Sequence, residues 1–334
     1  MISFISRRLL QAGLVLLALI LILLVLNTLS PITPGRVALG PSASSSSVNA
    51  YNQKVGFNDP LPARYVNYVN DVVHGRFGES AKTKQPVGRE LASRINVTFE
   101  LAFYSLLLSC LLGLVLGLSS AWKTRTANIA RFVISGLGSS PVFLTAFLLI
   151  ILFGVKFHFL PISGLSNYPD YPQGPTGWIL PDSIISGKFT YFFDSLLHLI
   201  MPVFTIALLP SVAIGRVLRG SMQAELKAGY VKTAETKGLS KSRIVFSHVL
   251  RNSMGPALSV TGLQFGLLIS GVVIVEEIFG IPGIGDYLAQ AIPNNDYPVV
   301  AAVTLVLGVT YVAINSIVDV IQIWIDPRIS KPTK

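Results

Sequence analysis

The sequence predicts an all-α polytopic membrane protein with six transmembrane helices. Of its 334 residues, 51% are hydrophobic even though the 28 glycines are left out of that count. Only 13% are charged, about half the share in an average soluble domain, which argues against a soluble enzyme and a disordered chain. Six stretches are long and apolar enough to cross a bilayer, which takes about 20 residues. The basic residues gather between alternate stretches, as topological anchors do.

The first predicted span is Leu9–Leu29, directly after Arg7 and Arg8. A cleaved signal peptide is the alternative, but the apolar run is about twice as long as a signal-peptide core and no small-residue cleavage site follows. We therefore expect a retained helix. The further predicted spans are Val97–Ala121, Ile129–Phe157, Phe192–Val217, Ala257–Phe279 and Val299–Ile325.

Two of these spans contain helix-softening or helix-breaking residues, namely Gly136, Gly138, Pro141, Pro202 and Pro210. Neighbouring helices or cavities can satisfy the backbone groups that such residues free. Two small-residue spacings, Gly113 with Gly117 and Gly262 with Gly266, permit close approach of helices.

The distribution of Lys and Arg predicts the orientation. Sixteen of the 26 basic residues lie on the side of the two termini, eight of them between Arg216 and Arg251. The two shorter loops on the other side carry only Lys156 and Lys188, while the long segment 30–94 exceeds the roughly 60 residues within which the positive-inside rule applies. We expect both termini in the cytoplasm. The net charge of +10 then reflects anchoring near anionic lipid rather than binding of nucleic acid.

The predicted parts are a first helix (1–30), an extracytoplasmic segment (31–94), a five-helix core (95–325) with the cytoplasmic loop 218–252, and a cytoplasmic tail (326–334). Within the second part, residues 31–50 contain a serine run and resemble a flexible linker.

An amphipathic helix is expected to follow, capped by Asp59, with Pro60 and Pro62 in its first turn and Gly75 at its end. Its expected apolar face consists of Tyr65, Val66, Val69, Val72 and Val73. This helix either packs on the outer surface or docks an extracytoplasmic partner.

Loop 218–252 predicts two helices joined by a glycine turn. The apolar residues Met222, Leu226, Tyr230 and Ala234 recur every four residues and would form one stripe. Gly238 suits the left-handed residue that ends a helix, and Leu239 follows where a hydrophobic cap contact belongs. Ser240 can cap a second helix whose inner face holds Ile244, Val245, His248 and Val249. The polar face mixes acids with lysines, which favours a protein partner over a helix lying on lipid.

Several chemistries are missing from the sequence. It has no G-x-x-x-x-G-K-[ST] phosphate loop, no H-E-x-x-H and no G-x-S-x-G motif. Cys110 stands alone inside an apolar run and the four histidines are scattered. We therefore expect neither an enzyme active site nor a directly bound cofactor or metal.

Acidic residues near the ends of spans are candidates for a functional role. Glu276 and Glu277 lie at the outer end of the fifth span, as a polar lining of a translocation path or as a solvated helix end. Asp319, one turn after Asn315, is expected to form an interhelical hydrogen bond.

Four segments resemble the permease subunits of bacterial dipeptide/oligopeptide ATP-binding-cassette (ABC) importers. They are residues 59–66 with the turn 75–80 (Gly-x-x-Gly-x-Ser), the Thr-Ala-x-x-x-Gly motif in 230–240, residues 276–285, and the Asp-Pro-Arg-Ile tail at 326–329. Gly229 departs from the family pattern, where an acidic residue is common, and a Ser-rich insertion at 42–47 lengthens the outer segment.

The resemblance implies a type I importer fold and a permease that forms the pathway for di- or oligopeptides delivered by a substrate-binding protein. It implies a complex with a second permease, which we expect to be a different chain, and with two ATPase subunits that hold ATP-Mg. The residues expected to couple to the ATPase are Tyr230, Thr233, Ala234, Lys237, Gly238 and Leu239, with Glu276 and Glu277 at the outer gate.

An ion-coupled secondary transporter or channel acting alone is the alternative. It predicts charged residues near the midplane of several spans and no protruding amphipathic loop, the reverse of what the sequence shows. The cargo stays open among dipeptides, longer peptides, glutathione-like peptides and nickel chelates.

Overall fold

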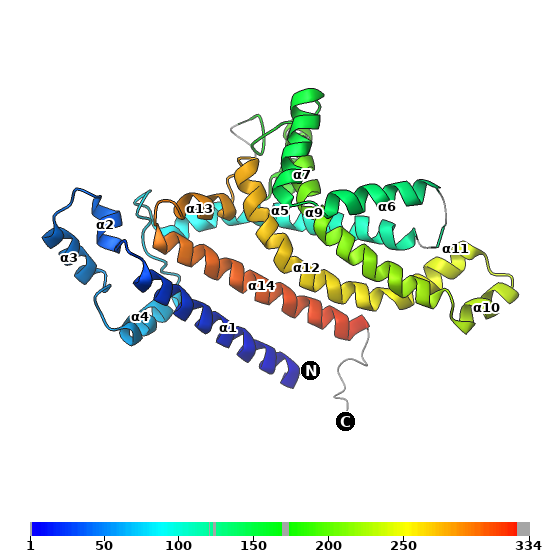
Figure 1. The fold of residues 1–334 in the computed structure, drawn as a ribbon, viewed down its shortest axis with the longest axis horizontal. Coiled ribbons are helices and arrows are strands. Elements are labelled where there is room, and N and C mark those ends of the chain that lie inside the picture. Colours follow the sequence, from blue (N-terminus) through cyan, green and yellow to red (C-terminus); the bar gives the residue numbers. More distant parts are fainter. Residues whose placement is uncertain (1, 120, 123–124, 169–173, 326–334) are drawn as a thin grey trace. The chain divides into compact units, whose positions relative to one another are not determined.

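The computed structural model describes residues 2–119, 121–122, 125–168 and 174–325, and its regular elements are helices (Figure 1). Within these ranges there is no β-strand, only an isolated bridge between Glu79 and Pro86. The chain divides into two compact units. Unit 1 comprises Met1–Thr98 with Pro282–Val312, and unit 2 comprises Phe99–Ile281 with Ala313–Lys334.

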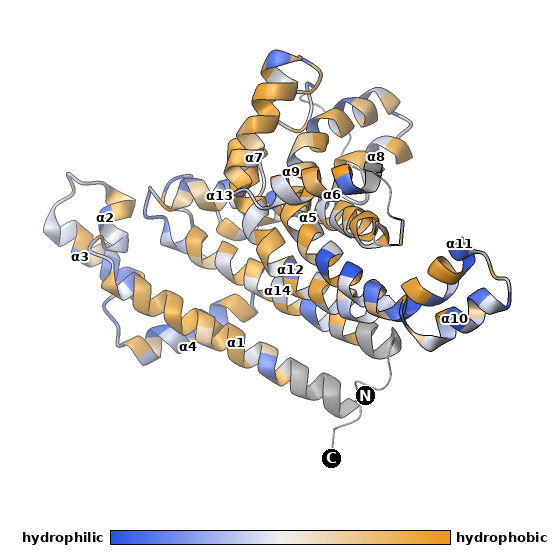
Figure 2. Cartoon of the chain, turned by 45° about the vertical axis from the view of Figure 1, so that its right-hand side comes forward, coloured by the Kyte–Doolittle hydropathy of each residue, from blue (hydrophilic) through white to orange (hydrophobic). Residues whose placement is uncertain are grey.

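Among the described residues, five helices are long and apolar enough to cross a membrane, which confirms five of the predicted spans. Most of the coloured part of α1 is hydrophobic, as Figure 2 shows. A long apolar segment of this kind is typical of a helix in lipid. The helices are α1 (Ile2–Leu29), α5 (Val87–Leu118), α9 (Phe189–Glu225), α12 (Leu250–Ile278) and α14 (Tyr297–Ile325).

The predicted third span is not one straight helix. α6 (Arg125–Gly138) and α7 (Val142–Leu149), the latter continued by a π-helical turn over Ile150–Lys156, meet at an angle of 117°. The third span predicted over Ile129–Phe157 is therefore bent in its middle, where the softening residues were expected; the pair is a broken span or a re-entrant segment. Pro141 precedes α7 directly, and proline disfavours a helical conformation of the residue before it.

The two prolines of α9 do not interrupt it, because α9 continues through both Pro202 and Pro210. The glycine spacing on α5 has the predicted role within unit 2. A Cβ at Gly113 would lie 2.7 Å from Ile214 Cγ2, and one at Gly117 would lie 2.5 Å from Leu218 Cγ. Only glycine permits α5 and α9 to approach this closely.

In unit 1, the segment expected to be a flexible linker contains two helices, α2 (Pro34–Leu39) and α3 (Ser45–Lys54). The serine run starts α3, since the Ser44 hydroxyl accepts a hydrogen bond from the amide of Ser47. The buried Asn52 side chain of α3 accepts the Gly35 amide of α2 at 2.7 Å. The linker prediction is wrong because serines cap helices as readily as they loosen loops.

The predicted amphipathic helix is α4 (Leu61–Val73), followed by Gly75 at φ +72°. Two details of the prediction are wrong. Its N-cap is Pro60 rather than Asp59, and Val66 and Val73 are largely exposed. The face that packs against α1 and the start of α14 consists of Tyr65, Tyr68, Val69 and Val72.

A second cluster in unit 1 explains why α5 begins ten residues before the predicted Val97. Val87 and Leu91, in the first turns of α5, are buried against α13 (Ile284–Ala291) and α14. The turn before α5 is held by two buried side chains, because the Ser80 hydroxyl donates to Asp296 Oδ2 at 2.5 Å.

Candidate functional site

The segment from the end of α9 to the start of α12 in unit 2 carries the residues predicted to couple the chain to an ATPase. α9 ends at Glu225, and a short break precedes α10 (Gly229–Thr236). The predicted four-residue stripe from Met222 to Ala234 therefore crosses this break rather than following one helix. We call residues 226–249 the hairpin segment.

The glycine turn is present as predicted. Gly238 has φ +76°, its amide donates to the Glu235 carbonyl at 2.9 Å, and the Leu239 amide donates to the Ala234 carbonyl at 3.2 Å. These two bonds form a Schellman motif, which requires a left-handed residue at the position of Gly238. Ser240 then caps α11 (Lys241–Ile244) through the Arg243 amide, as predicted.

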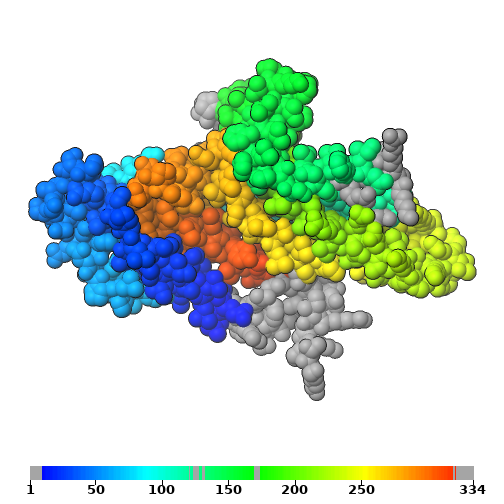
Figure 3. All heavy atoms as spheres, in the orientation of Figure 1, coloured from blue at the N-terminus to red at the C-terminus, as the bar shows by residue number. Residues whose placement is uncertain are grey.

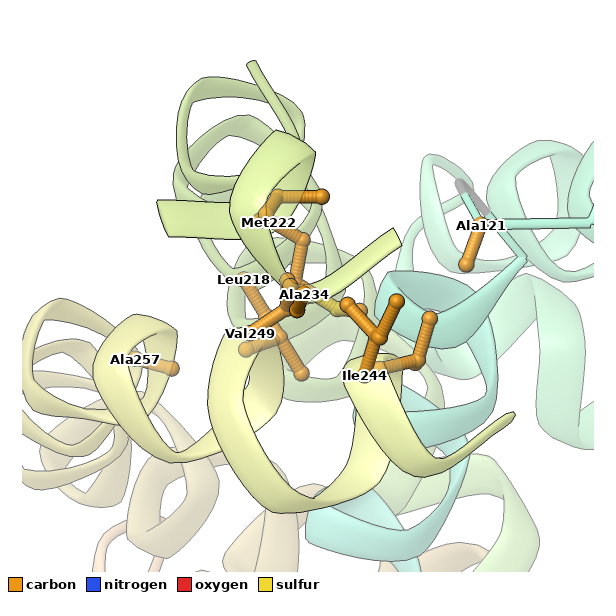
Figure 4. Packing of buried hydrophobic residues seen from close by; sticks show 9 residues of the cluster. Ala121, Leu218, Met222, Ala234, Ile244, Val249 and Ala257 are labelled. Carbon is orange, nitrogen blue, oxygen red and sulfur yellow. The ribbon is translucent and has the colours of Figure 1, made fainter. Parts of the chain in front are cut away.

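The inner face of the hairpin segment packs against its own chain. Figure 4 shows side chains from α9, α10, α11 and the following π-helical turn (Val245–Val249) converging on one apolar cluster. Ala234 lies in this cluster, and Leu239 packs against it half-buried. The other members are Ala121, Leu218, Met222, Val231, Ile244, Val245, Val249 and Ala257.

Three residues were misassigned to faces. Tyr230, predicted on one apolar stripe with Ala234, is exposed and does not belong to the cluster. Val231, three residues before Ala234, is buried although the predicted stripe omitted it. Its β-branched side chain at i−3 was the available signal, since residues three apart share a helix face. His248 is exposed rather than on the inner face, because the π-helical turn shifts the register of residues 245–249.

The outer face of the hairpin segment carries the remaining predicted coupling residues. Tyr230, Thr233, Lys237 and Gly238 are exposed. In Figure 3 the segment forms the yellow-green edge of unit 2. An exposed face on a hairpin anchored by its other face is the arrangement that a docking element needs.

Tyr230 ties the hairpin to the two long helices that flank it. Its hydroxyl donates to Glu225 Oε2 at 2.6 Å and accepts from Asn252 Nδ2 at 3.4 Å. Partial burial and the hydrogen bond to Glu225 raise the pKa of Tyr230, so the hydroxyl stays a donor at neutral pH. These hydrogen bonds therefore connect α10 to the end of α9 and to the start of α12.

The two glutamates at the end of α12 differ. Glu277 is exposed, whereas Glu276 has no exposed surface. A second Schellman motif ends the helix here, with Gly280 at φ +58° and the Ile281 amide donating to the Glu276 carbonyl at 2.8 Å. The interpretation of a solvated helix end is wrong for Glu276.

Two carboxylates that the sequence patterns did not single out organise the segment around α8 (Ile179–Ile185). The buried Glu100 accepts the first two amides of α8, from Ile179 at 2.8 Å and Leu180 at 3.0 Å. Asp182 accepts the amides of Gly174 and Thr176. A lone acid inside an apolar span, such as Glu100, was the available signal.

Across the described part of the chain, no three His, Cys, Asp or Glu side chains are grouped to hold a metal ion. The tail 326–329 and the Asp319 side chain, to which the sequence analysis assigned roles, lie outside the described residues.

Comparisons with known proteins agree with this architecture. Residues 111–331 match the family model of the binding-protein-dependent transport system inner membrane component, and residues 1–102 match the N-terminal model of the same system. The chain is 33% identical to the dipeptide transport system permease protein DppB of Alkalihalophilus pseudofirmus, over 98% of this chain and 99% of the relative. It is 35% identical to the probable D,D-dipeptide transport system permease protein DdpB of Escherichia coli K12, over 92% and 91%. It is 30% identical to the glutathione transport system permease protein GsiC of Salmonella choleraesuis, over 98% and 99%.

These matches cover nearly all of the chain, the helical hairpin included, and the relatives are permeases rather than catalytic subunits. Because these relatives are permeases of multi-subunit transport systems, the matches argue against an ion-coupled transporter acting alone. The chain belongs to the family of binding-protein-dependent transport system inner membrane components, the permease subunits of ABC importers.

Proposed function

We propose that this permease carries di- or oligopeptides that a substrate-binding protein delivers from outside the cell. The names of the dipeptide and peptide permeases that it resembles support this cargo class. The proposed complex contains a second, different permease chain and two ATPase subunits, which hold ATP-Mg. Uptake of a labelled dipeptide by the reconstituted complex, with and without the binding protein, tests the cargo.

We propose that the chain lies in the inner membrane of a bacterium. Both termini and loop 218–252 face the cytoplasm, and residues 31–94 lie outside. The sixteen-to-two asymmetry of basic residues supports this orientation. After replacement of Cys110, a cysteine at Ser45 should label from outside intact cells and one at Ser240 should not. Labelling of both from outside contradicts the orientation.

The hairpin segment is proposed to dock into the ATPase and to transmit its closure to the spans. The observation that carries this is the division of its two faces. Ala234 and Leu239 hold the hairpin to α9 and α12, while Tyr230, Thr233, Lys237 and the Gly238 turn stay exposed. Force on the exposed face therefore reaches two span helices through one apolar cluster.

Substitutions on the two faces separate docking from folding. Thr233→Asp places a charge on the exposed face, so the permease should keep its amount and thermal stability while retention of the ATPase falls about tenfold. Ala234→Asp buries an unpaired charge in the apolar cluster, which costs several kcal/mol and should destabilise the hairpin itself. Gln223→Asp, exposed on α9 outside the hairpin segment, is the control and should keep the ATPase. Unchanged ATPase retention and transport in Thr233→Asp would mean that this face does not dock.

At the other end of unit 2, we propose that the Glu276–Glu277 pair belongs to the outer gate. Glu277 is exposed and can attract the cationic amino terminus of a peptide, whereas Glu276 is enclosed and would act by shaping the gate. Glu277→Gln should weaken peptide uptake more at low than at high ionic strength. Glu276→Gln should alter uptake without this dependence on salt. Wild-type uptake in both variants contradicts the assignment.

A further inference from the structure

Unit 1 contains a cavity of about 630 Å³ that the proposed transport function does not use. Its walls come from α1, α2, α4, the turn before α5 and the start of α14. The volume lies within the range of pockets that bind small organic molecules.

Polar side chains line one end of the cavity, and two of them carry hydroxyl groups without a hydrogen-bond partner among the described residues. The hydroxyl oxygens of Tyr68 and Tyr297 are both buried, and neither has a hydrogen-bond partner among the residues that the structure describes. Arg64 lines the same end and lies within electrostatic range of Tyr297, which in turn lies within range of Tyr68. The Arg64 guanidinium is held in place by Asn27 Oδ1 at 2.8 Å and Thr28 Oγ1 at 2.9 Å.

This end is suited to donate hydrogen bonds. Burial, together with the charge of Asp71, raises the pKa of Tyr68 to about 12, so its hydroxyl keeps its proton at neutral pH. A guanidinium offers only donors. Buried hydroxyls without a partner cost free energy, and an acceptor placed between them would recover it. The matching ligand group carries several acceptor oxygens and a negative charge.

The rest of the lining describes the remainder of the ligand. Leu23, Leu24 and Leu26 belong to the candidate span Leu10–Leu29, and Pro298 and Val300 begin another. The cavity therefore lies where two spans end, at the depth where tyrosine and basic side chains meet lipid headgroups. Leu26 is 57% exposed, so the apolar wall continues to the surface of α1. Asp59 and Glu79 also line the cavity and could accept an ammonium group.

We propose that this cavity binds a membrane phospholipid, with its phosphate at Tyr68, Tyr297 and Arg64 and an acyl chain along Leu23 and Leu26 of α1. A peptide also carries a carboxylate and an ammonium group. The apolar wall at the end of a membrane span favours the lipid.

The test uses the complete transporter complex, delipidated in detergent and titrated with phosphatidylethanolamine, while native mass spectrometry counts bound lipid and a thermal scan follows stability. Phosphatidylethanolamine should bind and raise the melting temperature. Diacylglycerol, which lacks the phosphate, and inorganic phosphate, which lacks the chains, should each do so far less.

Isosteric variants locate the effect. Tyr68→Phe combined with Tyr297→Phe should weaken lipid binding at least tenfold, yet leave the delipidated complex no less stable, because it removes hydroxyls that lack partners. If the two tyrosine hydroxyls only stabilised the fold, the double variant would be less stable than the wild type in the absence of lipid. Tyr65→Phe is the control, since that hydroxyl donates to the Leu17 carbonyl and does not line the cavity. If the double variant does not assemble, Leu26→Trp, which fills the apolar end, should reduce lipid binding to a similar degree.

Three results would overturn the proposal. Equal stabilisation by inorganic phosphate would make the cavity a free-anion site, and displacement of lipid by a dipeptide would make it a cargo site. Unchanged lipid binding in the tyrosine double variant and in Leu26→Trp would show that this cavity is not the lipid site. Each of these results can occur while ATPase docking and binding-protein-dependent peptide uptake stay intact, so failure here is distinguishable from failure of the proposed function.

Discussion

Replacement of Gly238 by valine is the sharpest test of how the hairpin segment is built. The residue has φ +76°, and a Cβ added there would meet no heavy atom within 4 Å. Substitution therefore introduces no clash, and its whole cost is conformational. A side chain in the left-handed region costs about 1–2 kcal/mol, and β-branching places valine at or above the upper end of this range.

That cost has a definite structural consequence. The two Schellman bonds to the Glu235 and Ala234 carbonyls depend on the left-handed turn. If strain opens the turn, Leu239 leaves the apolar cluster and α11 loses its position against α9. Since 1.4 kcal/mol is a factor of ten, a cost of about 1–2 kcal/mol multiplies the population of the opened hairpin about 5- to 30-fold.

Three variants make the measurement specific. Gly238→Asn tolerates the left-handed region and should cost less than Gly238→Val. Gly229→Ala is the matched control, because Gly229 has no positive φ and equal space around it. The assays are the amount of ATPase that copurifies with tagged permease, and peptide uptake per ATP hydrolysed in proteoliposomes.

ATPase retention should be highest in the wild type and in Gly229→Ala, lower in Gly238→Asn and lowest in Gly238→Val. The amount of permease in the membrane should be the same in all four proteins. Equal retention in Gly238→Val and wild type would refute the link between this turn and docking. Equal loss in the asparagine and valine variants would show that backbone conformation is not the cause.

Other predictions concern the packing of unit 2 and the ionisation of unit 1. Gly117→Ala should lower the melting temperature of the complex, since its Cβ would lie 2.5 Å from Leu218 Cγ and overpacking costs about 1–3 kcal/mol; Gly136→Ala, with no atom within 4 Å, should not. Glu100→Gln should increase proteolysis around α8, because it removes the charge that caps two amides, an effect of about 1–2 kcal/mol. Raising the pH should destabilise unit 1, because the pKa of Tyr68 is raised by burial to about 12 while an unfolded tyrosine ionises near 10. The stability from this group is complete below pH 10 and is lost between about pH 10 and 12, and Tyr68→Phe should flatten that part of the stability profile.

Local features of the sequence determined much of the fold. Five spans follow from hydropathy alone, because lipid requires long apolar helices and leaves few alternatives. The turn at Gly238 and the cap at Ser240 were equally predictable, since each depends on bonds within a few residues. The family could be recognised from motifs of the same kind.

Tertiary structure decided what depends on distant neighbours. The pairing of α2 with α3 depends on the buried Asn52 side chain, and the two faces of α10 depend on packing partners in α9 and α12. Glu100 shows this most clearly, because its role as a cap appears only when α8, some 80 residues later, presents its amides to the carboxylate. A periodic pattern states that a face is apolar, but whether that face meets lipid, its own chain or another protein is determined by which surface the fold brings against it.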